Sequence, residues 1–178
     1  MDATIILAAA RQMRIPAVAL ACIGQTTMPH EAVRALVAAG HRQAALELLM
    51  RLLPKRYAVA WLCQCARAEP LDTSDREGVT LAEAWTKEPT EPHRRAALRL
   101  AAERDYGSVG AWIAAAAGWS GGSLSEEGQP PSPAPDHLTA IAATAAVNGL
   151  AALDTARFED RRDRFIGDAL GLLDGPAH

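Results

Sequence analysis

Residues 109–117 read VGAWIAAAA, and this stretch decides the fold class. Ser108, directly before it, is a residue type that caps helices, and the stretch is apolar on every side of the helix it would form. Residues 55–68, KRYAVAWLCQCARA, predict a second helix that is apolar nearly all round. A helix without a polar face lies at the centre of a protein, so both stretches indicate a core made of helices.

The composition favours helices along the whole chain. Hydrophobic residues make up 49% of the 178 residues but aromatic residues only 4%, and 39 alanines supply the difference. Alanine loses no side-chain entropy in a helix, and the β-branched runs that are typical of strands are missing. We therefore expect an all-α protein, a compact helical bundle of about eight to nine helices that needs no disulfide or metal.

Glycine, proline and capping residues divide the chain into segments. The capping box Ser74-Asp75-Arg76-Glu77 predicts the start of one helix, and Thr27 is the expected N-cap of another. Residues 121–136 contain Gly-Gly and four prolines, which predict an extended loop. The expected organisation is a helical core over residues 1–120, a Pro/Gly-rich loop over residues 121–136, and a helical pair over residues 137–178 that packs on the core.

Two stretches of the chain resemble each other with an offset of 52 residues. Residues 41–48 read HRQAALEL and residues 93–100 read HRRAALRL. An Ala-Trp pair follows each stretch, and the two tryptophans, Trp61 and Trp112, are 51 residues apart. A duplication predicts two helical units whose tryptophan-bearing helices form a common core. Chance similarity between alanine-rich helices is the alternative.

The charge pattern and the cysteines bear on partners and location. The formal net charge of −3 lacks the electrostatic footprint of a nucleic-acid binder, and the basic residues 93–95, spaced around a helix, indicate a solvated face. Met1-Asp2 places an acid where a signal peptide carries positive charge, and the apolar runs near it are shorter than the about 20 residues of a membrane span. Three cysteines, an odd number, fit a reducing cytosol. We expect a cytoplasmic protein that binds neither nucleic acid nor membrane.

Candidate catalytic residues lack the context that their chemistry requires. Gly118-Trp119-Ser120-Gly121-Gly122 matches the nucleophile elbow G-x-S-x-G, but that motif needs a strand before the serine, and a helix is expected here. Cys63 and Cys65, two apart on a helix, point in nearly opposite directions and cannot bind one metal ion. We expect no enzyme, no cofactor and no metal site; a small hydrolase that uses Ser120 or a cysteine is the alternative.

Two cations stand at the predicted start of the helix after Pro54. Lys55 and Arg56 are unfavourable there because the helix macrodipole is positive at its N-terminus. This arrangement indicates either simple solvation or an anionic group that the two side chains meet.

Two motifs resemble an uncharacterised family of small all-helical bacterial proteins. They are Leu-Pro-Lys-Arg-Tyr-Ala-Val-Ala-Trp at residues 53–61 and Trp-Ser-Gly-Gly-Ser-Leu at residues 119–124, and the similarity spans residues 44–153. The chain departs from the family pattern at Ala60, where a tryptophan is expected, and at Glu126-Glu127, where a proline is expected. Proteins of this kind look like neighbours of type VI secretion components, so the resemblance implies an accessory role in preparing an effector for secretion.

The last expected helix, residues 155–173, is amphipathic and carries the only two phenylalanines on one face. Such a face fits a partner's groove, or it packs on its own bundle. Together these observations predict a non-enzymatic adaptor or co-chaperone whose partner is an effector, an effector chaperone or a spike protein. A toxin-neutralising immunity protein is a further alternative. The residues expected to contact the partner are Lys55, Arg56, Trp119, Ser120, Gly121, Gly122, Ser123, Leu124, Phe158 and Phe165.

Overall fold

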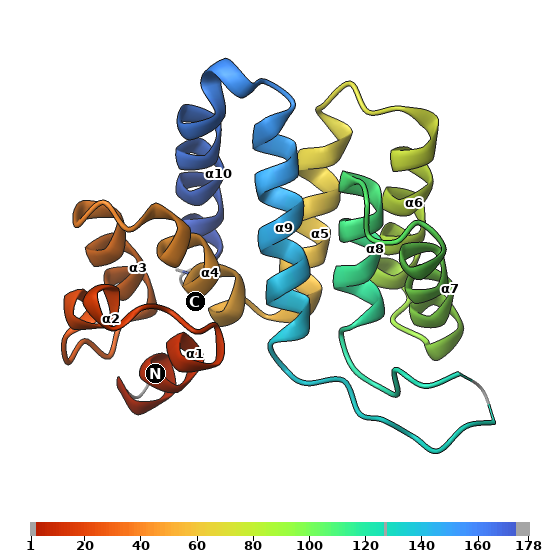
Figure 1. The fold of residues 1–178 in the computed structure, drawn as a ribbon, viewed down its shortest axis with the longest axis horizontal. Coiled ribbons are helices and arrows are strands. Elements are labelled where there is room, and N and C mark those ends of the chain that lie inside the picture. The colour runs from red at the N-terminus through yellow and green to blue at the C-terminus, as the bar shows by residue number, and fades with distance from the viewer. Residues whose placement is uncertain (1–2, 127, 174–178) are drawn as a thin grey trace. The chain divides into compact units, whose positions relative to one another are not determined.

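The computed structural model describes residues 3–126 and 128–173, and these residues form ten α-helices, one short 3-10 helix and no strand (Figure 1). The all-α prediction is confirmed, with slightly more helices than expected. Pro16 and Pro54 keep short neighbouring helices separate, because proline cannot continue a helix that precedes it. Some predictions concern residues that lie outside the described ones, namely Met1-Asp2, Glu127 and residues 174–178.

The chain divides into two compact units that are described separately below. Unit 1 comprises Met1–Pro54 and Ala151–His178, and unit 2 comprises Lys55–Leu150. This division does not coincide with the expected one, because the two C-terminal helices belong mainly to different units.

Unit 1 is organised around one buried helix. Its helices are α1 (Ala3–Gln12), α2 (Ala17–Ile23), α3 (Pro29–Ala38), α4 (Arg42–Leu52) and α10 (Phe158–Leu173). α4 packs against α1, α3 and α10. Leu46, Leu48 and Leu49 of α4 are completely buried, so this helix supplies the centre of the unit's core.

Unit 2 is organised around the helix that the sequence placed at the centre. Its helices are α5 (Lys55–Arg67), α6 (Thr73–Lys87), α7 (Glu91–Glu103), α8 (Val109–Gly118) and α9 (Leu138–Ala152), the last of which ends just past the unit. α8 packs against α5, α6 and α7 (Figure 1), and apart from Trp112 every residue from Gly110 to Gly118 is buried. α5 differs from the prediction, because a stripe of Tyr57, Ala60 and Gln64 is exposed.

Glycines allow α6 and α8 to approach closely. A Cβ on Gly78 would overlap the Gly110 carbonyl, and a Cβ on Gly110 would overlap the backbone of Asp75. At this crossing the Asp75 carboxylate accepts a hydrogen bond from the Gly110 amide at 2.8 Å. Ser108 caps α8, because its hydroxyl accepts a hydrogen bond from the Ala111 amide at 3.3 Å. Asp75 adds a second acceptor to this cap.

Two expected helix starts are wrong in detail. α6 begins at Thr73 rather than at the capping box, because the Asp72 carboxylate accepts from the Asp75 amide at 2.8 Å. α3 begins at Pro29, and the residue that organises its entry is Thr26 rather than Thr27. The Thr26 hydroxyl donates to Glu31 at 2.6 Å and accepts from the Met28 amide at 3.2 Å.

The two copies of the internal repeat match helix for helix, but their origin by duplication stays a prediction. The copies correspond to α3–α5 and α6–α8, and both matched stretches lie near the start of a helix, α4 and α7. The first copy is divided between the two units, whereas the second lies within unit 2.

Among the described residues no single helix is both long enough and apolar enough to cross a membrane. Leu138–Ala152 and Thr155–Leu173 reach that length and composition only together, as a bent pair.

Candidate partner-binding site

The segment between α8 and α9, residues 119–137, is a loop whose base is closed by its own backbone; we call it the glycine loop (Figure 1). The Leu124 amide donates to the Ser132 carbonyl at 2.8 Å, and the Ala134 amide donates to the Gly122 carbonyl at 3.0 Å. The Ser123 hydroxyl accepts from the amides of Ser125 and Ser132 at 3.1 and 3.0 Å. These bonds hold together two stretches about ten residues apart in sequence, as in a compact surface loop.

A buried arginine of α7 fixes the glycine loop. Arg94 is only 3% exposed; its Nη1 donates to the Gly118 carbonyl at 2.6 Å and its Nη2 to the Ser123 carbonyl at 2.9 Å. Glu91, one turn earlier, accepts from Arg94 Nε and Nη2 at 2.7 and 2.6 Å. Gly122 has a φ of 62°, and a Cβ there would lie 2.9 Å from Arg94 Nε. The buried charge is therefore paired and hydrogen-bonded, as a buried charge must be.

Two further cations bind carbonyls of the loop. Arg95 Nη1 donates to the Ser125 carbonyl at 2.9 Å, and its Nε lies 2.9 Å from Glu91. Lys55 Nζ donates to the Ser120 carbonyl at 3.0 Å and pairs with Asp136 at 3.2 Å. Hydrogen bonds from Arg94, then the charges of both arginines, lower the pKa of Glu91. Cations from α5 and α7 thus determine the conformation of a segment that is rich in glycine and proline.

Three half-buried aromatic side chains contact one another: Tyr106, Trp112 and the first residue of the loop, Trp119; we call them the aromatic cluster. The ring centroids of Tyr106 lie 5.5 Å from those of Trp112 and 5.2 Å from those of Trp119, and the two tryptophans are 6.1 Å apart. These distances are in the favourable range for aromatic pairs. Trp112 and Trp119 are seven residues apart and share one side of α8.

The turn before α8 holds Tyr106 in a backbone conformation that is uncommon for a large side chain. Asp105 and Tyr106, which follow the end of α7 at Glu103, have φ values of 49° and 53°. A bulky residue in the left-handed region costs about 1–3 kcal/mol and occurs mostly where the surrounding structure requires it. Here that conformation brings the Tyr106 ring against both tryptophans.

The acceptors that Lys55 and Arg56 meet belong to the chain itself, and they are backbone carbonyls apart from the Asp136 carboxylate beside Lys55. Lys55 binds the loop, as described above. Arg56 donates to the carbonyls of Thr86 and Lys87 at 2.7 and 3.2 Å, where the C-terminal end of α6 favours a cation. The alternative of simple solvation is therefore incomplete, and a role for either side chain toward a partner stays a prediction.

The two phenylalanines belong to unit 1, whereas the loop belongs to unit 2. Phe165 is only 3% exposed and is part of the core, so its ring is not available to a partner groove. Phe158 is half-buried, and the Arg162 guanidinium lies 5.0 Å from its ring centroid. The packing of this face within its own unit corrects the expectation that both rings form a contact surface.

Sequence reasoning missed Arg94, Glu91 and Tyr106. The basic residues 93–95 were interpreted as a solvated face, and for Arg94 this is wrong because the Gly118 carbonyl at the end of α8 and the Ser123 carbonyl of the loop cover its guanidinium. The spacing of Glu91 and Arg94, three apart on a helix, is the local signal of an ion pair. Nothing local indicates that the pair is covered by a loop that begins 25 residues later.

The candidate nucleophiles lie in unsuitable surroundings. Ser120 lies in the glycine loop just after helix α8, so the strand–turn–helix geometry of a nucleophile elbow is not formed. Cys63 is buried and its thiol donates to the Val79 carbonyl at 3.8 Å; burial, followed by the nearby Glu83, raises its pKa to about 12. A thiol with such a pKa is not a nucleophile near neutral pH. Among the described residues no group of three His, Cys, Asp or Glu side chains could hold a metal ion.

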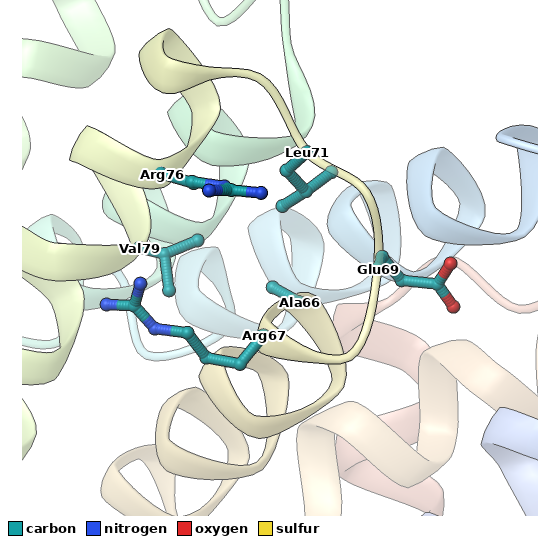
Figure 2. A pocket seen from close by; sticks show the side chains of 6 residues that line it. All are labelled: Ala66, Arg67, Glu69, Leu71, Arg76 and Val79. Atoms are coloured by element: carbon teal, nitrogen blue, oxygen red, sulfur yellow. The ribbon is translucent and has the colours of Figure 1, made fainter.

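A small pocket of about 230 Å³ lies between the end of α5 and α6. Arg67, on its rim, is held by Glu83 at 2.7 Å and by Thr80 at 3.2 Å, which leaves Arg76 as the other cation at the pocket. The Glu69 carboxylate points away from the pocket (Figure 2). The volume of this pocket is smaller than the about 300 Å³ of the smallest typical small-molecule sites, so we do not regard the pocket as a ligand site.

Comparisons with known proteins place the chain in one family. No curated protein and no solved structure is significantly similar to it. The model of one family, described as "Family of unknown function (DUF6931)", matches residues 32–173, which is well over half of the chain. The chain therefore belongs to this family of unknown function, DUF6931.

Proposed function

We propose that the chain is a non-enzymatic adaptor or co-chaperone that binds a protein partner through the aromatic cluster and the glycine loop. The aromatic cluster is the observation that carries this proposal. Tryptophan and tyrosine are enriched among the residues that dominate binding energy at interfaces, and all three members of the cluster are partly exposed.

The fixed conformation of the glycine loop supports the same proposal. Binding orders flexible segments at a cost, and a segment that is already ordered avoids most of it. The carbonyls of Gly118, Ser120, Ser123 and Ser125 are already bound by cations, while residues 128–133 are exposed. The exposed residues could therefore meet a partner with little loss of conformational entropy.

The class of partner rests on the motif resemblance alone. Trp-Ser-Gly-Gly-Ser-Leu at residues 119–124 resembles proteins found near type VI secretion components. We accordingly propose that the chain acts in the cytoplasm and helps to load an effector, with the effector, its chaperone or the spike protein as partner.

The test is affinity purification of the tagged full chain from the cytosol of the cells that make it, followed by mass spectrometry. We expect to recover a secretion effector, effector chaperone or spike protein. Trp119→Ala should reduce the recovered amount at least about tenfold, the loss typical of an interface hot spot. Tyr57→Ala, an equally aromatic but separate exposed position on α5 of the same unit, should leave it unchanged. Circular dichroism checks that each variant is folded.

Two alternatives give different outcomes in the same cells. Ser120→Ala keeps the backbone carbonyl that Lys55 binds, so in an adaptor it should reduce binding far less than Trp119→Ala, whereas a hydrolase would lose turnover. An immunity protein would protect cells from the cognate effector without being needed for its export. Equal recovery with Trp119→Ala and Tyr57→Ala would show that the aromatic cluster is not the contact surface.

A further inference from the structure

Unit 1 contains a second and larger pocket, of about 730 Å³. It is formed by the connection between α1 and α2, by the start of α4 and by the first turns of α10. Its volume lies within the about 300–1,000 Å³ of small-molecule sites. The charged and titratable side chains that line it are Arg14, His41, Arg42, Glu47, Glu159 and Arg162.

The acids at this pocket are matched within unit 1. Glu159 accepts from Arg162 Nη2 at 2.6 Å, and Glu47 accepts from the Gln43 amide group at 2.9 Å. Asp163 does not line the pocket, and both of its carboxylate oxygens accept a hydrogen bond from Arg42 Nε at 2.8 Å. Each of these carboxylates therefore has a hydrogen-bond donor within unit 1, an arginine for Glu159 and Asp163 and a neutral amide for Glu47.

Hydrogen-bond donors, by contrast, are in excess. Within residues 3–126 and 128–173, Arg14 forms no ion pair and the His41 side chain has no hydrogen-bond partner. The Nη1 and Nη2 atoms of Arg42 have no partner among these residues either, since only its Nε reaches Asp163. Arg162 Nε is buried without a partner in the same part of the chain. Of these donors Arg162 Nε is the buried one, and a buried donor of a charged group is normally satisfied, so it points to an acceptor that the described residues do not supply. The donors of Arg14, His41 and Arg42 are exposed or half-exposed and line the same pocket.

We infer that this pocket binds the oxyanion group, carboxylate or phosphate, of a small ligand. Arginine presents planar, forked donors that match both groups in bidentate geometry. The backbone amides in the first turn of α4 receive no side-chain cap and add donors on the same side. This site lies in unit 1 and stands independently of the partner surface proposed for unit 2.

The backbone at Arg14 provides a clean variant for testing this site. Arg14 has a φ of 57° and follows the end of α1, where the Ile15 amide donates to the Ala10 carbonyl at 3.1 Å and the Arg14 amide to the Arg11 carbonyl at 2.9 Å. This is the Schellman position, at which glycine is the usual residue. Arg14→Gly therefore removes the guanidinium and relieves the backbone, so the melting temperature should stay constant or rise.

The experiment is an NMR titration of the isotope-labelled full chain with inorganic phosphate and, separately, glutarate, against sodium chloride at equal ionic strength. We expect saturable shifts confined to the amides of residues 14 and 40–44. Arg14→Gly and Arg162→Gln should each weaken binding about tenfold, the loss expected for one charge-assisted hydrogen bond. Arg34→Gln, an exposed cation of α3 that does not line the pocket, is the matched control and should titrate like the wild type.

Comparison of the anions identifies the source of the group. Saturation by phosphate alone or by glutarate alone supports the site and assigns it to that ligand class. A short peptide with a free C-terminal carboxylate, compared with its amidated form, shows whether a chain end is accepted as well. Shifts no larger than those with chloride, or equal affinities for wild type, Arg14→Gly and Arg162→Gln, would overturn the inference.

Discussion

The beginnings of α4 and α7 carry the same pattern, His-Arg-x-Ala-Ala-Leu-x-Leu, and use its arginine in opposite ways. Arg94 in unit 2 is buried and makes four hydrogen bonds, two to Glu91, one to the carbonyl at the end of α8 and one to a loop carbonyl. Arg42 in unit 1 is half-exposed, uses only its Nε to bind Asp163 and lines a pocket. The donors of Arg94 are used within the fold, whereas Nη1 and Nη2 of Arg42 have no partner among the described residues.

The cause of this difference lies outside the repeated stretch. Glu91 stands one turn before Arg94, whereas the equivalent position in the first copy, 52 residues earlier, is Ala39. The end of α8 then supplies the carbonyl of Gly118, and the glycine loop supplies that of Ser123. A shared local sequence therefore fixes a helix start but not the environment of its arginine, because the acceptors come from elsewhere in the chain.

The strongest test of this comparison is the loss of the buried arginine. Arg94→Ala removes the donors that bind the Gly118 and Ser123 carbonyls and leaves Glu91 without its main partner, which should lower the free energy of unfolding by about 3 kcal/mol. Urea unfolding followed by circular dichroism measures the change. The glycine loop should also become sensitive to proteolysis. A loss as small as that of an ordinary surface substitution would show that other contacts hold the loop.

A second test alters the approach of α8 to α7 without touching the arginine. A Cβ on Gly118 would lie 2.7 Å from the Cα of Leu98, so Gly118→Ala must push the end of α8, and the carbonyl that Arg94 binds, away from α7. Overpacking of this kind costs about 1–3 kcal/mol in the free energy of unfolding. Gly121→Ala is the matched control, since a Cβ there has no atom within 4 Å. Equal unfolding midpoints for the two variants would contradict the tight packing described.

The sequence predicted the fold well because local signals decide it. Apolar stretches without a polar face placed α8 at the centre, and Pro16 and Pro54 gave helix boundaries. The start of α6 was misplaced because Asp72 and Ser74 are both good caps. The structure uses Asp72 and leaves the Asp75 carboxylate to cap α8, a contact with a residue 35 positions away.

The candidate site was predictable only in part. Trp119 and its glycines were singled out from the motif, and they do form a distinct loop. The groups that hold the loop were not, because the charge pattern around Arg94 is the same as that of a solvated helix face. Phe165 was overvalued for a similar reason, since an amphipathic helix shows which side is apolar but not whether its own unit covers that side.

Loss of the other arginine should have a much smaller effect on stability. Arg42→Ala removes an ion pair with Asp163 whose side chains are 41% and 38% exposed, and exposed pairs of this kind contribute little. We expect an unfolding midpoint in urea close to that of the wild type, and a loss that is a small fraction of the Arg94→Ala loss. Similar losses for the two variants would mean that the two copies use their arginines alike.

The smallest expected effect concerns pH. The folded state holds the pKa of Glu91 below its ordinary value, chiefly through hydrogen bonds from Arg94. A depressed pKa stabilises the fold at pH values above the unfolded pKa of about 4.3, and this contribution is lost as the pH falls through the lower folded value. Glu91 is 51% exposed, so solvent screening keeps the effect modest.

The comparison of Glu91→Gln with the wild type isolates this contribution. The difference between their unfolding free energies should be constant above about pH 5 and shrink toward pH 3, because protonation then removes the charge from the wild type as well. Glu103→Gln, on the exposed side of the same helix, is the control and should show no such dependence. A difference between Glu91→Gln and wild type that stays constant to pH 3 would show that the glutamate acts as a neutral acceptor. Arg94 would then be held by hydrogen bonds to neutral acceptors, including the carbonyls of Gly118 and Ser123.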